Sequence, residues 1–375
     1  MPLSEYSGTI GGDLNFGTIV NKKSAFQFTP IYAAIRILSE NISTLPKRIT
    51  TEIDGRLKYA YDSPLYQLIG IKPNGYTNAV TFWYSILSTL EGWGNGYALI
   101  KRRGGEPTEL HQLHPSWVTI TMVEGKKYFT VNSPTPFEFL RGAYSDEDVL
   151  HFMLYTFDGI VGIDPITYNS AAIGKAIATQ NFASEYYKKG GNIRAVLETD
   201  SNLGDNYKTF VEHFQNSSQN FDTPLLEYGV KYKQLTISPL AAQLAQSEAM
   251  SIQDIARIFN LPPHMLADLS RSTFSNVEHQ GTQFVQYSLR PTIKMIEAEI
   301  DCKLLFSDQS GWMSFKFDMN GLMRGDTAAR TAYYNNALQN GWLNPNEVRE
   351  LEGFEWVDGL DEYKRPLNLE SINTE

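Results

Sequence analysis

The sequence predicts an elongated α+β subunit, and three features of its 375 residues support that prediction. Helical and strand-like segments are mixed within residues 29–150. Two helical segments, 164–189 and 239–259, flank a small insert, and a longer helical segment at 275–306 contains a proline. A chain of this length provides two or three folding units. If the two flanking helices lie antiparallel, the insert sits at their far tip, away from the first domain.

The N-terminal residues 1–28 are rich in Gly, Ser, Thr and Asn and have few apolar anchors, which predicts an extended arm. The first helix is expected to follow, with Thr29 as its N-cap and Pro30 at the first helical position. Apolar residues then recur at helical spacing from Ile31 onward, and Pro46 ends the segment.

The rest of the first domain, whose bounds we place at 29–163, combines helix and sheet. A helix is predicted over 78–91, after a Pro-Asn-Gly turn at 73–75. Short β-type runs follow, separated by Gly-Gly, Gly-Glu-Pro and Glu-Gly breaks that are typical of turns. The basic stretch KRRGGEP at 101–107 is expected to form a hairpin tip, with nucleic-acid contact as the less favoured alternative.

Residues 164–189 are predicted to form one helix, of roughly 35–40 Å, capped by Asp164 and Pro165. One face of it changes from apolar to polar along its length: Ile166, Ile173, Ala176, Ile177, Gln180, Ser184 and Tyr187. Such a face suits packing against another protein chain better than packing in a dry core.

The insert at 190–238 is expected to be a small αβ unit, with strands in NIRAVLETD and LLEYGVKYKQLTI and a short helix between them. The helix at 239–259 follows, with Ser238 as its cap and Pro239 at its first position. A polar segment then interrupts the helical pattern at 260–274. Taken locally, this segment is a turn, because Pro262 and Pro263 stop one helix and Ser275 or Asn276 can cap the next.

The longest helix is predicted over 275–306, with apolar positions at helical spacing from Leu289 to Leu304. Pro291 lies inside this pattern, where it must remove one backbone hydrogen bond and kink the helix. A strand around Phe315 and two short helical segments follow, and the chain ends in an acidic tail.

Composition limits the class of protein. The net charge is −10, whereas proteins that grip nucleic acid through its phosphates usually carry a basic surplus; a local basic patch remains open. The single cysteine, Cys302, excludes a disulfide within the chain, and we interpret it as a small apolar helix residue rather than a catalytic thiol. The chain shows neither a secretion signal nor a run of about 18 apolar residues, so we expect a soluble, intracellular protein.

Catalytic motifs are not apparent. The chain lacks a phosphate-binding loop and the H-E-x-x-H, G-x-S-x-G and S-x-x-K patterns. His111 and His114 are three residues apart in a strand-like run, which places them on opposite faces and argues against a shared metal ion. We therefore expect a protein without enzymatic activity, bound metal or cofactor.

Four segments, in the right order over some 330 residues, resemble the bacteriophage portal proteins of HK97-like tailed phages. The first is IYAAIRILSENISTLP, which resembles the opening helix of that family. The second runs from SPLYQLIGIKPNGY through GWGNGYALIKRRGGEPTELHQLHPSWV. The third is IQDIARIFNLPPHML, with its Ile-Ala-Arg, Phe and Pro-Pro block, and the fourth is NPNEVRELEG.

The resemblance implies a ring, usually of twelve subunits, at one capsid vertex, through which terminase packages double-stranded DNA that is later ejected. Implied partners are the terminase large subunit, the major capsid and scaffolding proteins, and a head–tail adaptor. The implied location is the virion, after assembly in the host cytoplasm, with no membrane partner. The missing phosphate loop agrees, because ATP hydrolysis in these phages belongs to terminase. Ring symmetry multiplies every channel charge, so an acidic channel would repel DNA phosphates and keep the DNA centred.

The resemblance also implies a portal-type division of the chain. The parts are an arm (1–28), a wing (29–163), a stem helix (164–189), a clip (190–238), a second stem helix (239–259), a tunnel loop (260–274), a kinked long helix with a wing-return strand (275–319), and a short crown with an acidic tail (320–375). The crown is short, and larger relatives carry an extended C-terminal barrel, so the resemblance does not extend to any function of that barrel.

Two groups of site residues follow from that division. The DNA-facing residues of the tunnel loop would be Leu266, Asp268, Ser270, Arg271, Ser272, Thr273 and Phe274. The docking residues of the clip, for terminase or an adaptor, would be Glu198, Asp200, Asp205, Lys208, Glu212 and Glu227. Two other readings stay open: another phage head–tail connector ring, and a metal-dependent hydrolase with an unrecognised acidic site.

Overall fold

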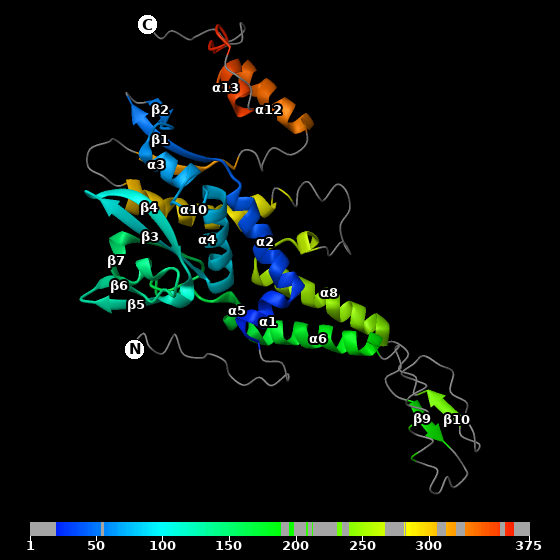
Figure 1. The fold of residues 1–375 in the computed structure, drawn as a ribbon. Helices are drawn as coiled ribbons and strands as arrows, with labels where there is room; N and C mark the ends of the chain where they lie inside the picture. Colours follow the sequence, from blue (N-terminus) through cyan, green and yellow to red (C-terminus); the bar gives the residue numbers. More distant parts are fainter. Residues whose placement is uncertain are drawn as a thin grey trace.

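The structure is a computed structural model that describes most of the chain. The described residues are 20–53, 56–188, 195–198, 208, 212, 231–234, 240–266, 281, 283–305, 313–319, 327–352 and 357–363. The elements that lie outside the central body are α6 (Ser170–Lys188), β9 (Ala195–Glu198), β10 (Lys231–Gln234), α8 (Leu240–Ile258), α12 (Thr327–Gln339) and α13 (Pro345–Leu351). Figure 1 shows α6 and α8 extending side by side from a mixed body, with β9 and β10 beyond them and α12 and α13 on the other side.

Helices α2 (Thr29–Ser43) and α4 (Ala79–Trp93) pack together in the body. The predicted helix at 78–91 is confirmed, because the Asn78 side chain caps α4 by accepting from the Thr81 N–H at 2.8 Å. The predicted cap of α2 is wrong. Thr29 is already helical and Phe28, which has no side-chain acceptor, occupies the cap position.

A short helix, α1 (Lys22–Gln27), replaces part of the predicted extended arm. Asn21 and Ser24 form a capping box, in which each side chain accepts from the other residue's backbone N–H at 2.9 and 3.0 Å. Ala25 and Phe28 are buried in the main core. The arm prediction failed here because six mostly polar residues show no helical periodicity, and residues 1–19 lie outside the described part.

Three antiparallel sheets build the rest of the body. The strands are β1 (Lys47–Ile53), β2 (Arg56–Tyr59), β3 (Asn95–Arg103), β4 (Glu106–Leu113), β5 (Val118–Val123), β6 (Lys126–Val131), β7 (Gly142–Ser145), β8 (Val149–Met153) and β11 (Met313–Phe317). Their orders are β4-β3-β8, β5-β6-β7 and β11-β1-β2. The β3–β4 hairpin turns at Gly104 and Gly105, both with positive φ, which confirms the hairpin predicted at 101–107.

The predicted strand around Phe315 exists as β11, and its pairing partner β1 lies far away in sequence. The side chain of Trp83, fully buried in α4, stacks on Phe315 at 6.3 Å and meets Phe317 edge-on at 5.8 Å. Its indole N–H donates to the Ile69 carbonyl at 3.0 Å, so the polar group of this side chain is paired. Aromatic packing around Trp83 therefore joins α4 to the distant strand β11.

The single helix predicted over 164–189 is divided in the structure. It consists of α5 (Pro165–Tyr168) and α6, separated at Asn169, whose side chain donates to the Pro165 carbonyl at 2.8 Å. This local bond competes with helical backbone bonding, as Asn side chains often do. The predicted fade of the helix face is confirmed where described: Ile173 and Ala176 are buried, while Gln180 and Ser184 are exposed.

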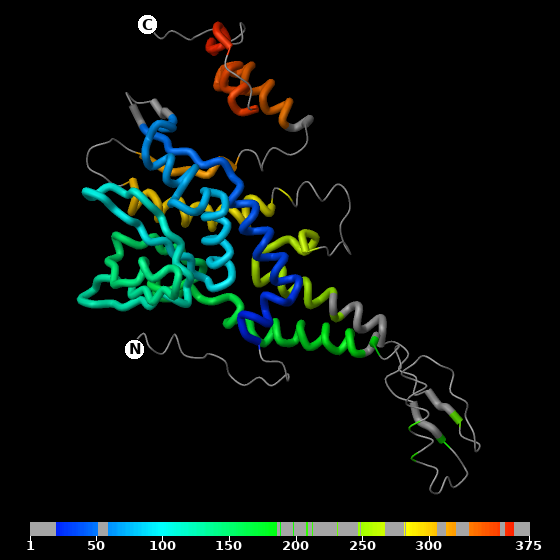
Figure 2. Tube along the Cα trace, viewed as in Figure 1, coloured from blue at the N-terminus to red at the C-terminus, as the bar shows by residue number. Residues whose placement is uncertain are grey.

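The long C-terminal helix changes its winding twice. A π-helix at Phe284–Leu289 leads into α10 (Arg290–Ile300), and a second π-helix at Asp301–Leu305 ends it. The predicted apolar positions at 289, 293, 296, 300 and 304 are all buried, while Cys302 is exposed. In Figure 2 this segment crosses the body, and α10 contacts β8 and β11. Short helices α3 (Pro64–Tyr66) and a π-helix at Gln67–Ile71 complete the core.

Candidate functional site

The residues predicted to face DNA fall mostly outside the described part of the chain: Asp268, Ser270, Arg271, Ser272, Thr273 and Phe274. Only Leu266 is described, at the end of a 3-10 turn (Pro263–Leu266). Its side chain is 8% exposed and belongs to the main hydrophobic core. Leu266 therefore packs inward and anchors one end of the segment that follows.

The residues predicted for clip docking are described in part. Glu198, Lys208 and Glu212 are exposed, and the other three (Asp200, Asp205 and Glu227) lie outside the described residues. Glu198 ends β9, directly opposite Lys231 of β10. The structure thus places one predicted acidic residue across a strand pair from a basic one.

A contact between distant parts of the chain joins Asn260 to Tyr287 and Ser288, and no local sequence pattern predicts it. Asn260, just beyond α8, has a left-handed backbone with φ +51, which Asn tolerates better than most residues. Its side-chain amide donates to the Tyr287 carbonyl at 2.7 Å, and the Ser288 hydroxyl donates to the Asn260 carbonyl. We call this pair of bonds the loop-end contact.

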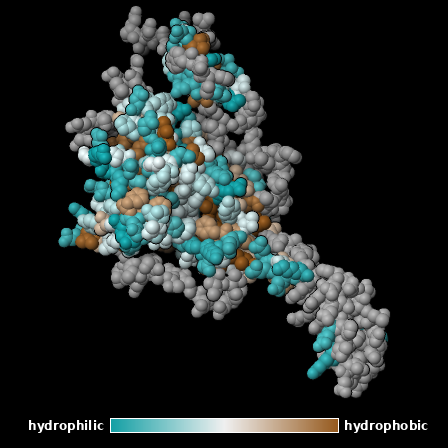
Figure 3. Space-filling model, in the orientation of Figure 1, coloured by the Kyte–Doolittle hydropathy of each residue, from teal (hydrophilic) through white to brown (hydrophobic). Residues whose placement is uncertain are grey.

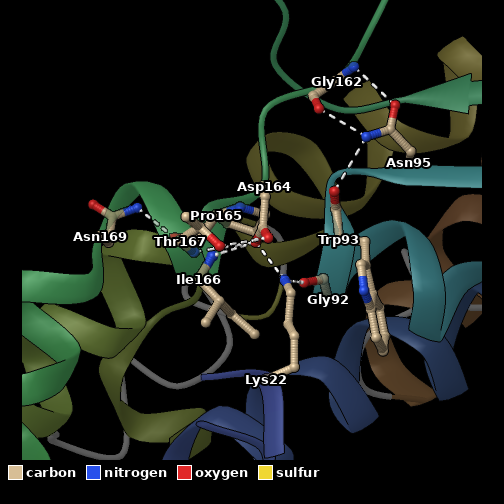
Figure 4. Close-up of polar contacts among 10 residues, drawn as sticks. All are labelled: Lys22, Gly92, Trp93, Asn95, Gly162, Asp164, Pro165, Ile166, Thr167 and Asn169. Atoms are coloured by element: carbon tan, nitrogen blue, oxygen red, sulfur yellow. Dashed lines mark hydrogen bonds and ion pairs between the residues drawn. The ribbon is translucent and has the colours of Figure 1, made fainter. Parts of the chain in front are cut away.

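The N-terminus of α5, which we call its base, is held by a polar network that also involves α1 and α4. Figure 4 shows the Lys22 amino group between the Gly92 carbonyl and the Asp164 carboxylate, and it donates to both. Asp164 also caps α5, accepting from the N–H groups of Ile166 at 2.9 Å and Thr167 at 3.2 Å. The predicted cap at Asp164 is thereby confirmed.

Charge and burial are balanced at this network. Burial lowers the pKa of Lys22, and the neighbouring Asp164 carboxylate opposes that shift. The Lys22 amino group also lies 5.0 Å from the centre of the Trp93 ring. In contrast, burial raises the pKa of nearby Glu91, in α4, to about 8. Burial thus disfavours the charged form of both groups, and a neighbouring carboxylate offsets part of that effect for Lys22.

Asn95 fixes the segment that leads into α5. Its side-chain oxygen accepts from the Gly162 N–H at 2.8 Å, and its amide donates to the Gly162 carbonyl at 2.7 Å and the Trp93 carbonyl at 3.1 Å (Figure 4). The backbones approach so closely here that a Cβ on Gly94 would lie 2.0 Å from the Ile163 carbonyl oxygen. Gly94 also ends α4 in the left-handed conformation.

An exposed aromatic patch lies beside this base. The side chains of Tyr155, Phe157 and Tyr168 are 62–69% exposed. The Phe157 ring lies between the other two, with its centre 5.2 Å from that of Tyr155 and 6.5 Å from that of Tyr168. Figure 3 shows the largely hydrophilic face of the body, with small apolar groups between the polar residues. Three large aromatic side chains gathered in one place are unusual for a free surface.

The histidines named above are engaged with neighbouring side chains. His111 lies 3.1 Å from the Tyr76 hydroxyl and 2.9 Å from the Glu109 carboxylate, and His114 lies 2.7 Å from the Ser116 hydroxyl. Among the described residues, no group of three or more His, Cys, Asp or Glu side chains is arranged to hold a metal ion. Across the same residues, every helix is too short or too polar to span a membrane.

Comparison with known proteins identifies the family. The phage portal protein family matches residues 29–353. A protein of Streptomyces phage phiC31 described as a probable portal protein is 30% identical, with 96% of this chain and 82% of that protein covered. The portal protein of Enterobacteria phage HK97 is 26% identical, with 91% of this chain and 82% of that protein covered.

Solved structures agree on the fold. An HK97-family phage portal protein from Corynebacterium diphtheriae superposes with a TM-score of 0.59 at 15% identity, covering 82% of this chain and 97% of that one. A chain from the virion of a native gene transfer agent particle gives a TM-score of 0.62 at 15% identity, covering 90% and 95%. The structures support the fold and the family match spans most of the sequence, and this chain therefore belongs to the phage portal protein family.

Proposed function

We propose that this chain forms a ring-shaped channel at one vertex of a phage capsid, through which terminase packages double-stranded DNA that later leaves by the same route. The observation that carries the proposal is the family match over residues 29–353. A related neck, from a gene transfer agent particle, was solved with C12 symmetry, which favours twelve subunits here. In this role the protein is a structural channel and docking platform, not an enzyme.

The paired helices α6 and α8 support a ring. Their pairing buries the apolar start of the α6 face and leaves Gln180 and Ser184 exposed. The aromatic patch (Tyr155, Phe157 and Tyr168) adds exposed apolar area at the base of α5. Both surfaces suit contact with a neighbouring subunit, because half-polar faces and aromatic side chains are common at such interfaces.

We propose that the segment from 267 to 274 faces the channel, with Arg271 making weak, sequence-independent contacts to the DNA backbone. Leu266 is buried in the main core, which supports an anchoring role for it at the start of this segment. A net charge of −10 supports passage rather than capture, because acidic surfaces repel phosphate. The insert at 190–238, which includes β9 and β10, would dock terminase and then a head–tail adaptor, and the body would contact capsid and scaffolding proteins.

Electron micrographs of the purified protein test the ring. Averaged views along the axis should show closed rings, and a stable 42.4 kDa monomer at high concentration and in all salts would refute the proposal. In a packaging assay, Arg271→Ala should reduce DNA uptake while ring images stay unchanged. Loss of the ring itself would show that Arg271 is structural.

A matched control is Arg103→Ala, which removes an exposed basic side chain at the tip of the β3–β4 hairpin. We expect normal packaging from this variant. A packaging defect in Arg103→Ala but not in Arg271→Ala would instead support DNA contact by the hairpin. Co-purification with tail proteins in place of terminase would favour a connector ring, and magnesium-dependent DNA cleavage would favour a hydrolase.

A further inference from the structure

A relay of polar side chains lies at the edge of the β4-β3-β8 sheet, and the proposed channel role does not use it. The Glu109 carboxylate lies 2.9 Å from Nε2 of His111, and Nδ1 of the same ring lies 3.1 Å from the Tyr76 hydroxyl. Glu109 and His111 are two residues apart on β4, so both side chains lie on one face of this edge strand. Tyr76 reaches the same ring from the turn before α4.

The carboxylate fixes which ring nitrogen of His111 carries the hydrogen. An ionised carboxylate can only accept, and a neutral imidazole has one donor and one acceptor nitrogen. Nε2 therefore donates to Glu109, and Nδ1 accepts from the Tyr76 hydroxyl. A hydroxyl, a basic ring nitrogen and an orienting carboxylate, linked in this order, are the groups that activate a hydroxyl nucleophile in acyl transfer.

The turn that carries Tyr76 is fixed to β4 by its own hydrogen bonds. The buried Asn74 side chain donates to the Leu110 carbonyl at 2.8 Å, and the Leu110 N–H donates to the Pro73 carbonyl at 2.8 Å. The Asn74 side-chain oxygen accepts from the Tyr76 N–H at 3.0 Å. The backbone of Tyr76 is therefore held beside β4 independently of the relay, as a preorganised site requires.

Access and charge limit the reagent that could react with Tyr76. His111 is 3% exposed, so the proton acceptor is shielded from water, whereas Tyr76 is 54% exposed. Burial raises the pKa of Tyr76, and the nearby Glu109 carboxylate raises it further, so this hydroxyl needs a base to react. The Phe137 ring lies 6.4 Å from the Tyr76 ring, and the Phe139 ring lies 5.4 Å from the His111 ring. The carboxylate would repel an anionic phosphoryl donor, while these rings offer an apolar surface to a neutral acyl donor.

We propose that Tyr76 is an acylation site, at which His111 acts as the general base and Glu109 is a positioning residue that orients the imidazole. The co-reactant is a neutral activated ester or thioester. The Tyr76 oxygen bonds to the carbonyl carbon while its proton moves to Nδ1 of His111. The bond from that carbon to the leaving group then breaks, and the proton passes from Nδ1 to the leaving group or to water. The product is an O-acyl tyrosine beside a neutral imidazole.

Labelling of the full chain with p-nitrophenyl acetate tests the site at pH 8, where histidine side chains are ordinarily neutral. Peptide mass spectrometry gives the acetylation rate at Tyr76 and, in the same sample, at Tyr168. Tyr168 is a suitable comparator because it is 62% exposed and its ring also lies beside a phenylalanine ring. General-base assistance should make Tyr76 react at least about tenfold faster than Tyr168. Equal rates at the two tyrosines would overturn the proposal.

Substitutions in the relay assign the roles. His111→Asn should lower the rate at Tyr76 to that at Tyr168, and Glu109→Gln should lower it by a smaller factor. Tyr76→Phe should remove the label from its peptide. Circular dichroism confirms folding, and Glu109→Gln, whose side chain is half exposed, keeps the proposal testable if His111→Asn does not fold. An unchanged rate at Tyr76 in a folded His111→Asn or in Glu109→Gln would refute the relay.

A matched control and an isotope effect separate chemistry from structure. Glu138→Gln removes another exposed carboxylate, which accepts from the Thr135 hydroxyl at 2.9 Å, and should leave the rate at Tyr76 unchanged. Proton transfer to a base should make the reaction of Tyr76 slow down more in D2O than that of Tyr168. An equal isotope effect at the two tyrosines would exclude general-base assistance. These measurements do not require ring assembly, so a failure of the channel role would leave the test of Tyr76 intact.

Discussion

Asp164 accepts hydrogen bonds from four donors at the base of α5, and its replacement should therefore destabilise the junction between the body and the α6–α8 pair. The donors are the Lys22 amino group, the N–H groups of Ile166 and Thr167, and the Thr167 hydroxyl at 2.7 Å. Lys22 and Asp164 are both about one quarter exposed, so their ion pair is partly shielded from water.

Two contributions set the expected loss of unfolding free energy for Asp164→Ala. Losing an N-cap side chain costs about 1 kcal/mol. Leaving the part-buried Lys22 amino group without its carboxylate costs about 2 kcal/mol. The total is about 3 kcal/mol. Asp164→Asn keeps an oxygen that can cap α5 but removes the charge, so it should lose only about 2 kcal/mol, mainly from the ion pair.

The unfolding free energies of these variants can be measured by urea unfolding followed by tryptophan fluorescence, because Trp93 lies beside Lys22 and reports on the junction. Asp158→Ala is the control, since Asp158 also accepts backbone bonds, from Ile160 at 2.8 Å and Val161 at 3.1 Å, but in an exposed loop. That control should cost less than 1 kcal/mol. Equal losses for Asp164→Ala and Asp164→Asn would show that capping contributes nothing. Losses no larger than those of Asp158→Ala would refute the assigned role of the network.

Two further perturbations follow from the same region. Glu91 has a pKa raised by burial to about 8, against about 4.3 in an unfolded chain. The folded state therefore holds a proton that the unfolded state releases, so stability should fall as pH rises from about 4.3 to 8, by up to about 1.4 kcal/mol per pH unit. Glu91→Gln should abolish this slope in urea titrations at pH 5 and 8; a slope that persists would mean that Glu91 is not its source. Gly94→Ala should cost at least about 3 kcal/mol, because its Cβ would lie 2.0 Å from the Ile163 carbonyl oxygen. Gly159→Ala has a similar φ of +71 but open space, so thermal melting should show a loss of only about 1 kcal/mol, and equal losses would rule out the steric explanation.

Interpretation of the site depended on contacts that have no local sequence pattern. The tunnel-loop and clip residues were chosen by resemblance, and their roles remain predictions because most of them lie outside the described residues. Leu266 was chosen with them, but its burial is decided by the core beneath it. The loop-end contact went unrecognised because nothing in the residues around Asn260 indicates that Tyr287 lies nearby.

The sequence by itself determined the family, the α+β class and most helix positions, because periodicity, capping and turn chemistry act over a few residues. The helix at 78–91 and the Gly104-Gly105 hairpin are examples. Tertiary structure decided which distant segments meet: β11 with β1, Lys22 with Asp164 across 142 residues, and Asn260 with Tyr287. It also shows the break at Asn169 and the helix α1 within the predicted arm. These features depend on packing and on the pairing of buried polar groups, whose free energy no short stretch of sequence contains.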